Sequence, residues 1–245
     1  MLGLTDLRQK GFARIPSAFP IDTIEEFRSI VTGGLSRMGQ TRAVAHSRHL
    51  AGFHRFPEFA SIATNIRENP AVTAFLLAAF GPDQPFDIGL TDITVNRSQD
   101  WHTDLLRGPY ASFLDGCDPW AKDETPCLKV LVYLQPGKSL RLLPGSHLRP
   151  SPLDDGQIAE SVEQAAKTQL DIASGDVVIL DIRTVHRGST DEEMADTQLA
   201  DTPKILVSMV FGATGSRFAQ AMRDGNLCRM AQWDQKFLPS SSLAQ

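Results

Sequence analysis

The segment Leu128-Lys129-Val130-Leu131-Val132-Tyr133-Leu134 is the clearest strand in the sequence, and Lys129 is its only charged residue. Valine and aromatic residues favour extended structure, so this run predicts a buried strand. A second strong strand is expected over residues 176–182, and residues 203–211 are expected to be its neighbour. These strands would form the centre of a sheet.

Helical patterns precede the strands. We expect helices over residues 4–10, from Asp22 as N-cap, over residues 59–66 and over residues 71–80, whereas residues 41–60 and 108–125 are expected to be loops. From residue 86 onward strands dominate, which favours an α+β arrangement in which helices support a β-sandwich or barrel. We expect one domain over residues 1–245, with helical support over about 1–85, a β-core over about 86–215 and a C-terminal tail over 216–245.

Composition narrows the classes of function. The chain has 245 residues and a formal net charge of −5, so it lacks the basic excess of a general nucleic-acid binder. No apolar run has the length of a membrane span, and the first residues lack the pattern of a signal peptide. The odd number of cysteines, Cys117, Cys127 and Cys228, favours free thiols in a reducing compartment. We therefore expect a cytoplasmic protein with neither membrane nor nucleic-acid partners.

A candidate metal site comes from two distant segments, Gln99-Asp100-Trp101-His102-Thr103-Asp104 and Arg183-Thr184-Val185-His186-Arg187-Gly188. His102 and Asp104 point the same way if the chain there is extended. Alone this pair is weak evidence, and a surface histidine in a polar turn explains it as well. Strand ends meet at one mouth of a double-stranded β-helix, where His186 would complete the facial triad of a non-haem Fe(II) oxygenase.

Other histidines compete with this assignment. His147 lies in a Pro-Gly-Ser-His turn, where it is a rival third ligand or a polar turn residue bonded to backbone. His46, His49 and His54 lie in a stretch without clean periodicity, and their spacing matches no ligand pattern. We favour a solvated surface for these three residues over substrate contact.

Lys204 is a candidate anion-binding residue. It begins the strand that we place beside the one leading to His186, and it shares a face with Leu206 and Ser208 by alternation. An anionic co-substrate extending from the metal to Lys204 would pair with both positive charges. A surface lysine that protects an edge strand is an equally good interpretation from these residues alone.

Several segments together resemble the phytanoyl-CoA dioxygenase family of Fe(II)/2-oxoglutarate oxygenases. They are Gly11-Phe12-Ala13-Arg14-Ile15-Pro16, Trp101-His102-Thr103-Asp104, the strand from Lys129 to Leu134, Leu142-Leu143-Pro144-Gly145-Ser146-His147, and the segment from Asp181 to Gly188. The similarity extends over about residues 4–215.

The resemblance implies an α+β, mainly β fold with a double-stranded β-helix (jelly-roll, cupin-like) core and supporting N-terminal helices. It implies that His102, Asp104 and His186 hold Fe(II), with 2-oxoglutarate as co-substrate and O₂ as oxidant. Lys204 stands where the family usually has an arginine for the far carboxylate of 2-oxoglutarate, and it offers a point charge in place of a fork. Asp104 points away from halogenation, because halogenating relatives have a small residue there. Further candidates for co-substrate binding are Asn96, Ser189 and Lys129.

The predicted substrate is a small, anionic molecule that is hydroxylated at a C–H bond with release of succinate and CO₂. Arg141, Arg107 and Arg187 could face the mouth and bind a carboxylate or phosphate, with Trp101 as a wall beside the metal. Each arginine could equally pair with one of the many acidic residues.

Two other functions stay open. A metal-dependent cupin-like enzyme without 2-oxoglutarate would not need a cation at Lys204, and a non-catalytic binding protein on the same scaffold would tolerate loss of the triad. The oligomeric state is left open.

Overall fold

The computed structural model describes residues 3–40, 46–151 and 155–237. A large antiparallel sheet is its main structural layer. Its seven strands are arranged in the order β1-β8-β5-β10-β4-β3-β2. Their bounds are β1 Phe12–Ile15, β2 Gly39–Gln40, β3 Arg48–Ala51, β4 Pro85–Val95, β5 Leu128–Tyr133, β8 Val177–Asp181 and β10 Ile205–Ala213. The central strands β4, β5 and β10 provide side chains that line one side of the site described below.

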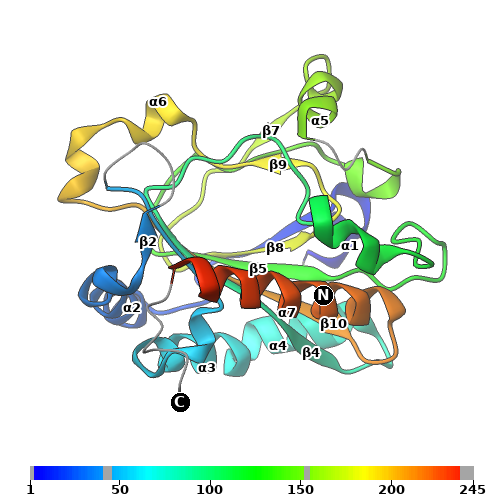
Figure 1. The fold of residues 1–245 in the computed structure, drawn as a ribbon, viewed down its shortest axis with the longest axis horizontal. Coiled ribbons are helices and arrows are strands. Elements are labelled where there is room, and N and C mark those ends of the chain that lie inside the picture. Colours follow the sequence, from blue (N-terminus) through cyan, green and yellow to red (C-terminus); the bar gives the residue numbers. More distant parts are fainter. Residues whose placement is uncertain (1–2, 41–45, 152–154, 238–245) are drawn as a thin grey trace.

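A smaller sheet lies across from the large one, so that the two sheets enclose a central space (Figure 1). It has the order β7-β6-β9, with β6 at Arg141–Leu142, β7 at Thr168–Gln169 and β9 at His186–Arg187. Apolar side chains from both sheets fill part of the space between them, among them Leu131, Tyr133 and Leu142. The remaining space is lined by both polar and apolar side chains and contains the candidate site.

Helices pack on both faces of the large sheet and beside the smaller sheet (Figure 1). The helices are α1 Leu4–Lys10, α2 Ile21–Gly33, α3 Ala60–Glu68, α4 Pro70–Phe80, α5 Asp155–Val162, α6 Asp191–Met194 and α7 Arg217–Phe237. In the described part of the chain, none of them combines the length and the hydrophobicity that crossing a bilayer requires. Helices α1 to α4 pack on the outer face of the large sheet, so the helical support expected before residue 85 is present.

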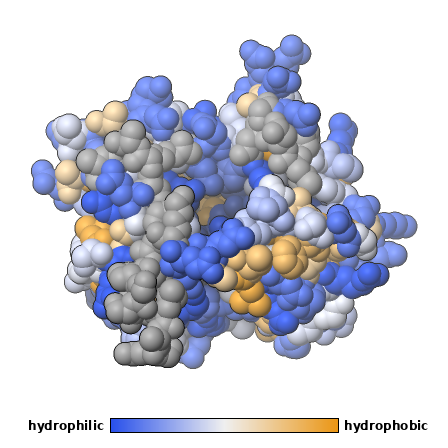
Figure 2. All heavy atoms as spheres, viewed as in Figure 1, coloured by the Kyte–Doolittle hydropathy of each residue, from blue (hydrophilic) through white to orange (hydrophobic). Residues whose placement is uncertain are grey.

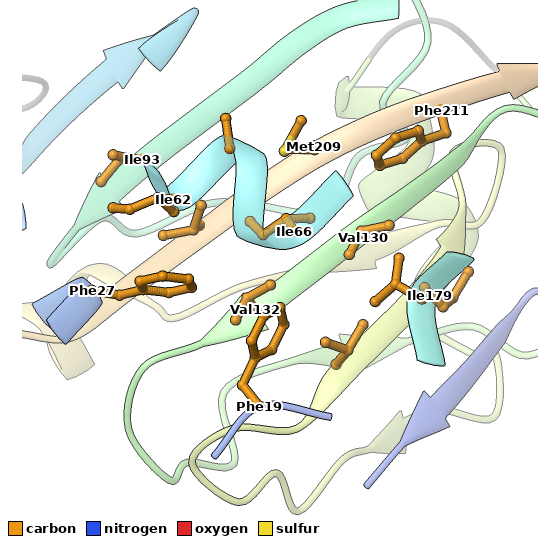
Figure 3. Packing of buried hydrophobic residues seen from close by; sticks show 14 of the residues in the cluster. Phe19, Phe27, Ile62, Ile66, Ile93, Val130, Val132, Ile179, Met209 and Phe211 are labelled. Carbon is orange, nitrogen blue, oxygen red and sulfur yellow. The ribbon is translucent and has the colours of Figure 1, made fainter. Parts of the chain in front are cut away.

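Alternation along the strands divides the two faces of the sheet. Val130 and Val132 of β5 pack with Phe27 of α2 and Ile62 of α3 in the main hydrophobic core (Figure 3). Lys129, Leu131 and Tyr133 therefore face the opposite side, toward the smaller sheet. The outer face provides the apolar core, while the inner face is available for polar side chains.

Several local predictions need correction. Residues 46–60 are not simply a loop, because β3 pairs with β4 inside the large sheet; residues 41–45 lie outside the described part. Helix α2 begins after Pro20, with no side-chain cap from Asp22. A short 3-10 helix at Gly108–Leu114 interrupts the expected loop 108–125.

Two further corrections concern the C-terminal third. Strand β10 pairs with β5 and β4, not with β8, because β5 lies between β8 and β10. The segment 216–245, expected to be a tail, contains the 21-residue helix α7, which packs against β4, β10 and the 3-10 helix at Gly108–Leu114. Its apolar positions lack a strong period, which explains why the sequence did not reveal it.

Replacing Phe27 by alanine tests the packing of the helical layer. Phe27 is fully buried between α2 and the sheet, so Phe27→Ala should lower the free energy of unfolding by about 3–5 kcal/mol. Ile21, on the same helix, is 57% exposed, and Ile21→Ala should change it by less than about 0.5 kcal/mol. Urea denaturation of both variants gives the comparison, and similar losses would contradict the proposed layer.

Candidate metal centre and co-substrate site

His102 and His186 are held side by side by reciprocal backbone hydrogen bonds. The amide of His102 donates to the carbonyl of His186, and the amide of His186 donates to the carbonyl of His102, both at 2.9 Å. Their ring centroids are consequently 4.2 Å apart. His186 is the first residue of β9, so the segment containing His102 extends the smaller sheet at this point.

The carboxylate of Asp104 lies close to both imidazoles. Its amide donates to the carbonyl of Ile182 at 2.9 Å, which continues the same pairing of segments. Its Oδ2 lies 3.4 Å from Nε2 of His186, and its Oδ1 lies 3.7 Å from Nε2 of His102. One ligand atom from each residue lies within 4.8 Å of the other two, and this is the group of potential metal ligands found among the described residues.

The protonation of both imidazoles suits metal binding. Nδ1 of His102 is 2.7 Å from the carbonyl oxygen of Asp100, and Nδ1 of His186 is 2.9 Å from that of Thr184. A carbonyl oxygen can only accept, so Nδ1 carries the proton in each ring and Nε2 keeps its lone pair. Burial lowers the pKa of both side chains below the ordinary histidine value, so both rings are neutral at pH 7.

The carboxylate of Asp104 is charged and has one unused oxygen. Burial alone would raise its pKa, but Lys129, whose Nζ donates to Oδ1 at 2.9 Å, and the two histidines lower it below its usual range. Oδ2 is buried without a hydrogen-bond partner among the described residues. A buried, charged oxygen beside two imidazole lone pairs is the donor set of a divalent metal such as Fe(II), so the residues fit that ion.

Gln99 connects the triad with the pocket of Lys204. Its Nε2 lies 2.7 Å from Nε2 of His102 and donates to that lone pair. Gln99 also lines the small cavity that contains Lys204 and Ser189. The sequence placed Gln99 in the metal segment without assigning it a role, and only its side-chain direction reveals this connection.

Lys204 is half-buried and directly precedes β10, which lies inside the large sheet rather than at its edge. Its Nζ donates to the hydroxyls of Ser139 and Ser189, and burial lowers its pKa to about 8 against the opposing effect of Glu193. No carboxylate forms an ion pair with it in the described part of the chain. Lys204 and Ser189 are therefore brought together as predicted, and Ser139 is an additional residue that its remote position concealed.

Other predicted site residues have different surroundings. The side-chain Nδ2 of Asn96 donates to the backbone carbonyl of Leu199 at 2.8 Å, and its Oδ1 accepts from the backbone N–H of Lys204 at 2.7 Å. Asn96 therefore holds two backbone segments in place and does not face the triad. Arg141 pairs with Glu193 at 2.7 Å. Arg187 lies over the ring of Trp101, 5.8 Å from its centroid. Trp101 packs beside a small apolar cluster and does not line the cavity of the triad.

A cavity of about 470 Å³ opens beside the triad and is lined by His102, Asp104, Lys129 and Arg107. Figure 2 shows a hollow at the centre of this face, surrounded mainly by hydrophilic residues. Further lining residues that sequence reasoning did not select are His49, Asp92, Thr94, Arg97, Leu206, Ser208 and Arg229. Leu206 and Ser208 confirm the predicted inner face of β10.

The remaining histidines do not join the triad. His147 is buried, with Nε2 at 3.1 Å from the carbonyl of Arg8, so it anchors α1 as a turn residue. The predicted solvated surface is wrong for His49, which is 4% exposed and pairs with Asp92 at 2.8 Å. His54 and His46 are partly buried and contact Thr91 and the backbone of Met194.

Comparisons with known proteins identify solved structures that have a similar fold. No family model and no curated protein sequence matches the chain. Among solved structures, the α-ketoglutarate-dependent carbocyclase SnoK from nogalamycin biosynthesis has a TM-score of 0.64 at 18% identity, covering 93% of this chain and 89% of SnoK. HygX from Streptomyces hygroscopicus, with nickel, 2-oxoglutarate and hygromycin B bound, has a TM-score of 0.60 at 18% identity, covering 87% of each chain. EctD from S. alaskensis in its apoform has a TM-score of 0.61 at 15% identity, covering 87% of this chain and 76% of EctD.

These likenesses confirm the predicted fold class, an α+β protein with a cupin-like double-stranded β-helix core. At such low identity they define the fold and not the activity. The narrower resemblance to the phytanoyl-CoA dioxygenase family stays a prediction.

Replacing Lys129 by methionine tests the charge balance of the centre. In the metal-free protein, Lys129→Met leaves the buried carboxylate of Asp104 without its cation, and the free energy of unfolding should fall by about 3–5 kcal/mol at pH 7. Because the folded-state pKa of Asp104 is lowered, this contribution is present at neutral pH and is lost as the pH falls below about 4.

The matched control is Lys138→Met, which removes an exposed ion pair with Asp171 and should leave stability unchanged within error. Urea titrations at pH 7 and at about pH 2.5, in the presence of a chelator, compare the two variants above and below the range in which the contribution of Asp104 is lost. Equal effects of the two substitutions would mean that Lys129 does not balance Asp104.

Proposed function

We propose that this protein is an Fe(II)- and 2-oxoglutarate-dependent oxygenase of the phytanoyl-CoA dioxygenase type. It would oxidise, most simply by hydroxylation, a C–H bond of a small metabolite that bears an acidic group, with release of succinate and CO₂. The observation that supports this best is the convergence of two neutral imidazoles with the unpartnered oxygen of Asp104. The fold is shared with SnoK, an α-ketoglutarate-dependent carbocyclase, and with HygX, whose crystal structure contains 2-oxoglutarate.

In this proposal His102, Asp104 and His186 hold the iron, which supplies the activation of O₂ when bound. The protein contributes orientation. The Nδ1 hydrogen bonds fix both rings, and Lys129 occupies Oδ1 of Asp104 so that Oδ2 is directed to the metal. Three protein ligands leave open positions for the co-substrate and for O₂.

Lys204 would bind the far carboxylate of 2-oxoglutarate. A half-buried ammonium without an ion-pair partner in the described region would be stabilised by an anion, and the hydroxyls of Ser139 and Ser189 provide further donors beside it. Gln99 lies between this pocket and His102. Its amide would move from Nε2 when the metal binds, and it could then donate to the co-substrate.

A cupin-like enzyme that does not use 2-oxoglutarate is the second candidate, since the triad alone does not specify the co-substrate. The pocket of Lys204 distinguishes the two, because only the first candidate gives a role to a half-buried lysine that has no carboxylate partner among the described residues. We therefore favour the 2-oxoglutarate-dependent enzyme.

A spectroscopic titration tests the proposed centre. Anaerobic addition of Fe(II) and 2-oxoglutarate should produce a weak visible charge-transfer band, and His102→Ala should abolish it. His147→Gln, which changes the rival histidine, should keep the band. Absence of the band in the unmodified protein would exclude 2-oxoglutarate chelation, and its loss in His147→Gln would contradict the assigned ligands.

The charge of Lys204 should control co-substrate affinity. Lys204→Ala should weaken 2-oxoglutarate binding by about tenfold or more, because a charge-assisted contact is lost, and leave metal affinity unchanged. Since the pKa of Lys204 is about 8, affinity in the unmodified protein should fall as the pH rises from 7 to 9. Lys204→Arg stays charged over this range and should give a flatter profile. Parallel losses of metal and 2-oxoglutarate binding in Lys204→Ala would refute this role.

A further inference from the structure

A second polar group lines the wall of the metal-site cavity. It consists of His49 from β3, Asp92 from β4 and Arg229 from α7, which we call the wall cluster. Asp92 is paired in register with Ser208 of β10, four residues beyond Lys204. At the rise of a strand this is roughly 13 Å, so the wall cluster is separate from the lysine pocket.

Asp92 presents a charged oxygen to this cavity. Its Oδ1 lies 2.8 Å from Nε2 of His49 and 3.9 Å from Nη2 of Arg229. Burial alone would raise the pKa of Asp92, but these two neighbours lower it below the ordinary value, so the carboxylate is ionised. Oδ2 makes no hydrogen bond with any described residue and is therefore available for a cation.

Arg229 presents a complementary donor edge. Its Nε and Nη2 donate to Oδ1 of Asn226 at 3.3 and 3.1 Å, whereas Nη1 has no hydrogen bond within the described ranges. The position of α7 beside the cavity is fixed by close packing of Gly225 against Leu106, since a Cβ added to Gly225 would lie 2.3 Å from Cδ1 of Leu106. Tyr110 also donates to the side chain of Gln232 one turn further on. The guanidinium is therefore held at the cavity by a rigid element.

We propose that the wall cluster binds the zwitterionic head of an α-amino acid, which makes a free amino acid the substrate class of the enzyme proposed above. The ammonium group would donate to Oδ2 of Asp92, and the carboxylate would accept from Nη1 of Arg229. This inference rests on the proposed function for the reaction itself, but not for the binding.

The adjacency of the two charges argues for a zwitterion. A simple anion at Arg229 would be repelled by Asp92, and a simple cation at Asp92 would be repelled by Arg229. In an α-amino acid one carbon atom separates the two charged groups, so both residues are satisfied together, and charge-assisted hydrogen bonds make this pairing selective. The nearby lining residues Leu90 and Leu105 favour an aliphatic side chain directed toward the metal centre.

Matched ligands test this inference with the full chain loaded with Mn(II) and saturating 2-oxoglutarate under anaerobic conditions. Mn(II) is chosen because it binds free amino acids weakly. The probes are L-leucine and L-valine, their analogues without the ammonium group, 4-methylpentanoate and 3-methylbutanoate, and their analogues without the carboxylate, L-leucinamide and L-valinamide. Calorimetry should show at least one amino acid binding about tenfold or more tightly than both of its analogues.

Variants assign the two contacts. In Asp92→Asn the preference for the amino acid over the analogue without the ammonium group should disappear, and in Arg229→Gln the preference over the amide should disappear. Arg223, on the same helix, pairs with Asp224 and does not line the cavity, so Arg223→Gln should keep both preferences. Preferences that survive in both wall variants would overturn the assignment.

The comparison within the unmodified protein needs no variant and keeps the inference falsifiable if a substitution impairs folding. Should neither amino acid bind more tightly than its analogues, the zwitterion site is refuted. The Fe(II)/2-oxoglutarate band is measured on the same preparation. Presence of the band without amino-acid binding refutes this inference alone, whereas absence of the band refutes the proposed reaction and leaves the binding result to be judged separately.

Discussion

The candidate site depends on the two backbone hydrogen bonds that join His102 to His186. They connect positions 84 residues apart in the sequence, and they set the rings side by side before any metal is considered. The next pairing, from the amide of Asp104 to the carbonyl of Ile182, brings the carboxylate to the same place. The triad is thus a consequence of strand pairing, and a change of register by one residue would turn the ligands to the other face.

The large sheet supports this arrangement by separating two chemistries on its two faces. Toward the helices, residues such as Val130 and Met209 contribute only packing. Toward the smaller sheet, Lys129 and Ser208 on the same strands line the cavity. Because side chains alternate along a strand, β5 and β10 stabilise the core with one face and position a polar group at the site with the other. Lys129 was visible in the sequence for this reason, as the one charged residue in an apolar strand.

Periodic and local features were the predictable part of the molecule. The strand around Leu131 depends on neighbours in the sequence, so pattern was sufficient to find it. The His-x-Asp pair at His102 is weak evidence by itself, and the resemblance of several segments to one family was needed to select it. The place of β3, the neighbours of β10 and the burial of His49 depend on pairing between distant segments, which no local pattern encodes. Asn96 shows the same limit, since a polar residue beside a site looks identical whether it faces a ligand or binds backbone.

The electrostatic role of Lys129 explains why a charged carboxylate is tolerated at the centre before metal binds. An ionised Asp104 between two neutral rings would be costly to bury alone, and the ammonium at Oδ1 offsets that cost. The same contact engages one oxygen and leaves Oδ2 for the metal, which favours single-oxygen ligation. A ligand set of two nitrogens and one oxygen keeps further coordination positions free, and those positions are what a co-substrate and O₂ would need. One ion pair therefore balances the buried carboxylate in the metal-free protein, and in the proposed enzyme it would leave Oδ2 as the oxygen of Asp104 that holds the metal.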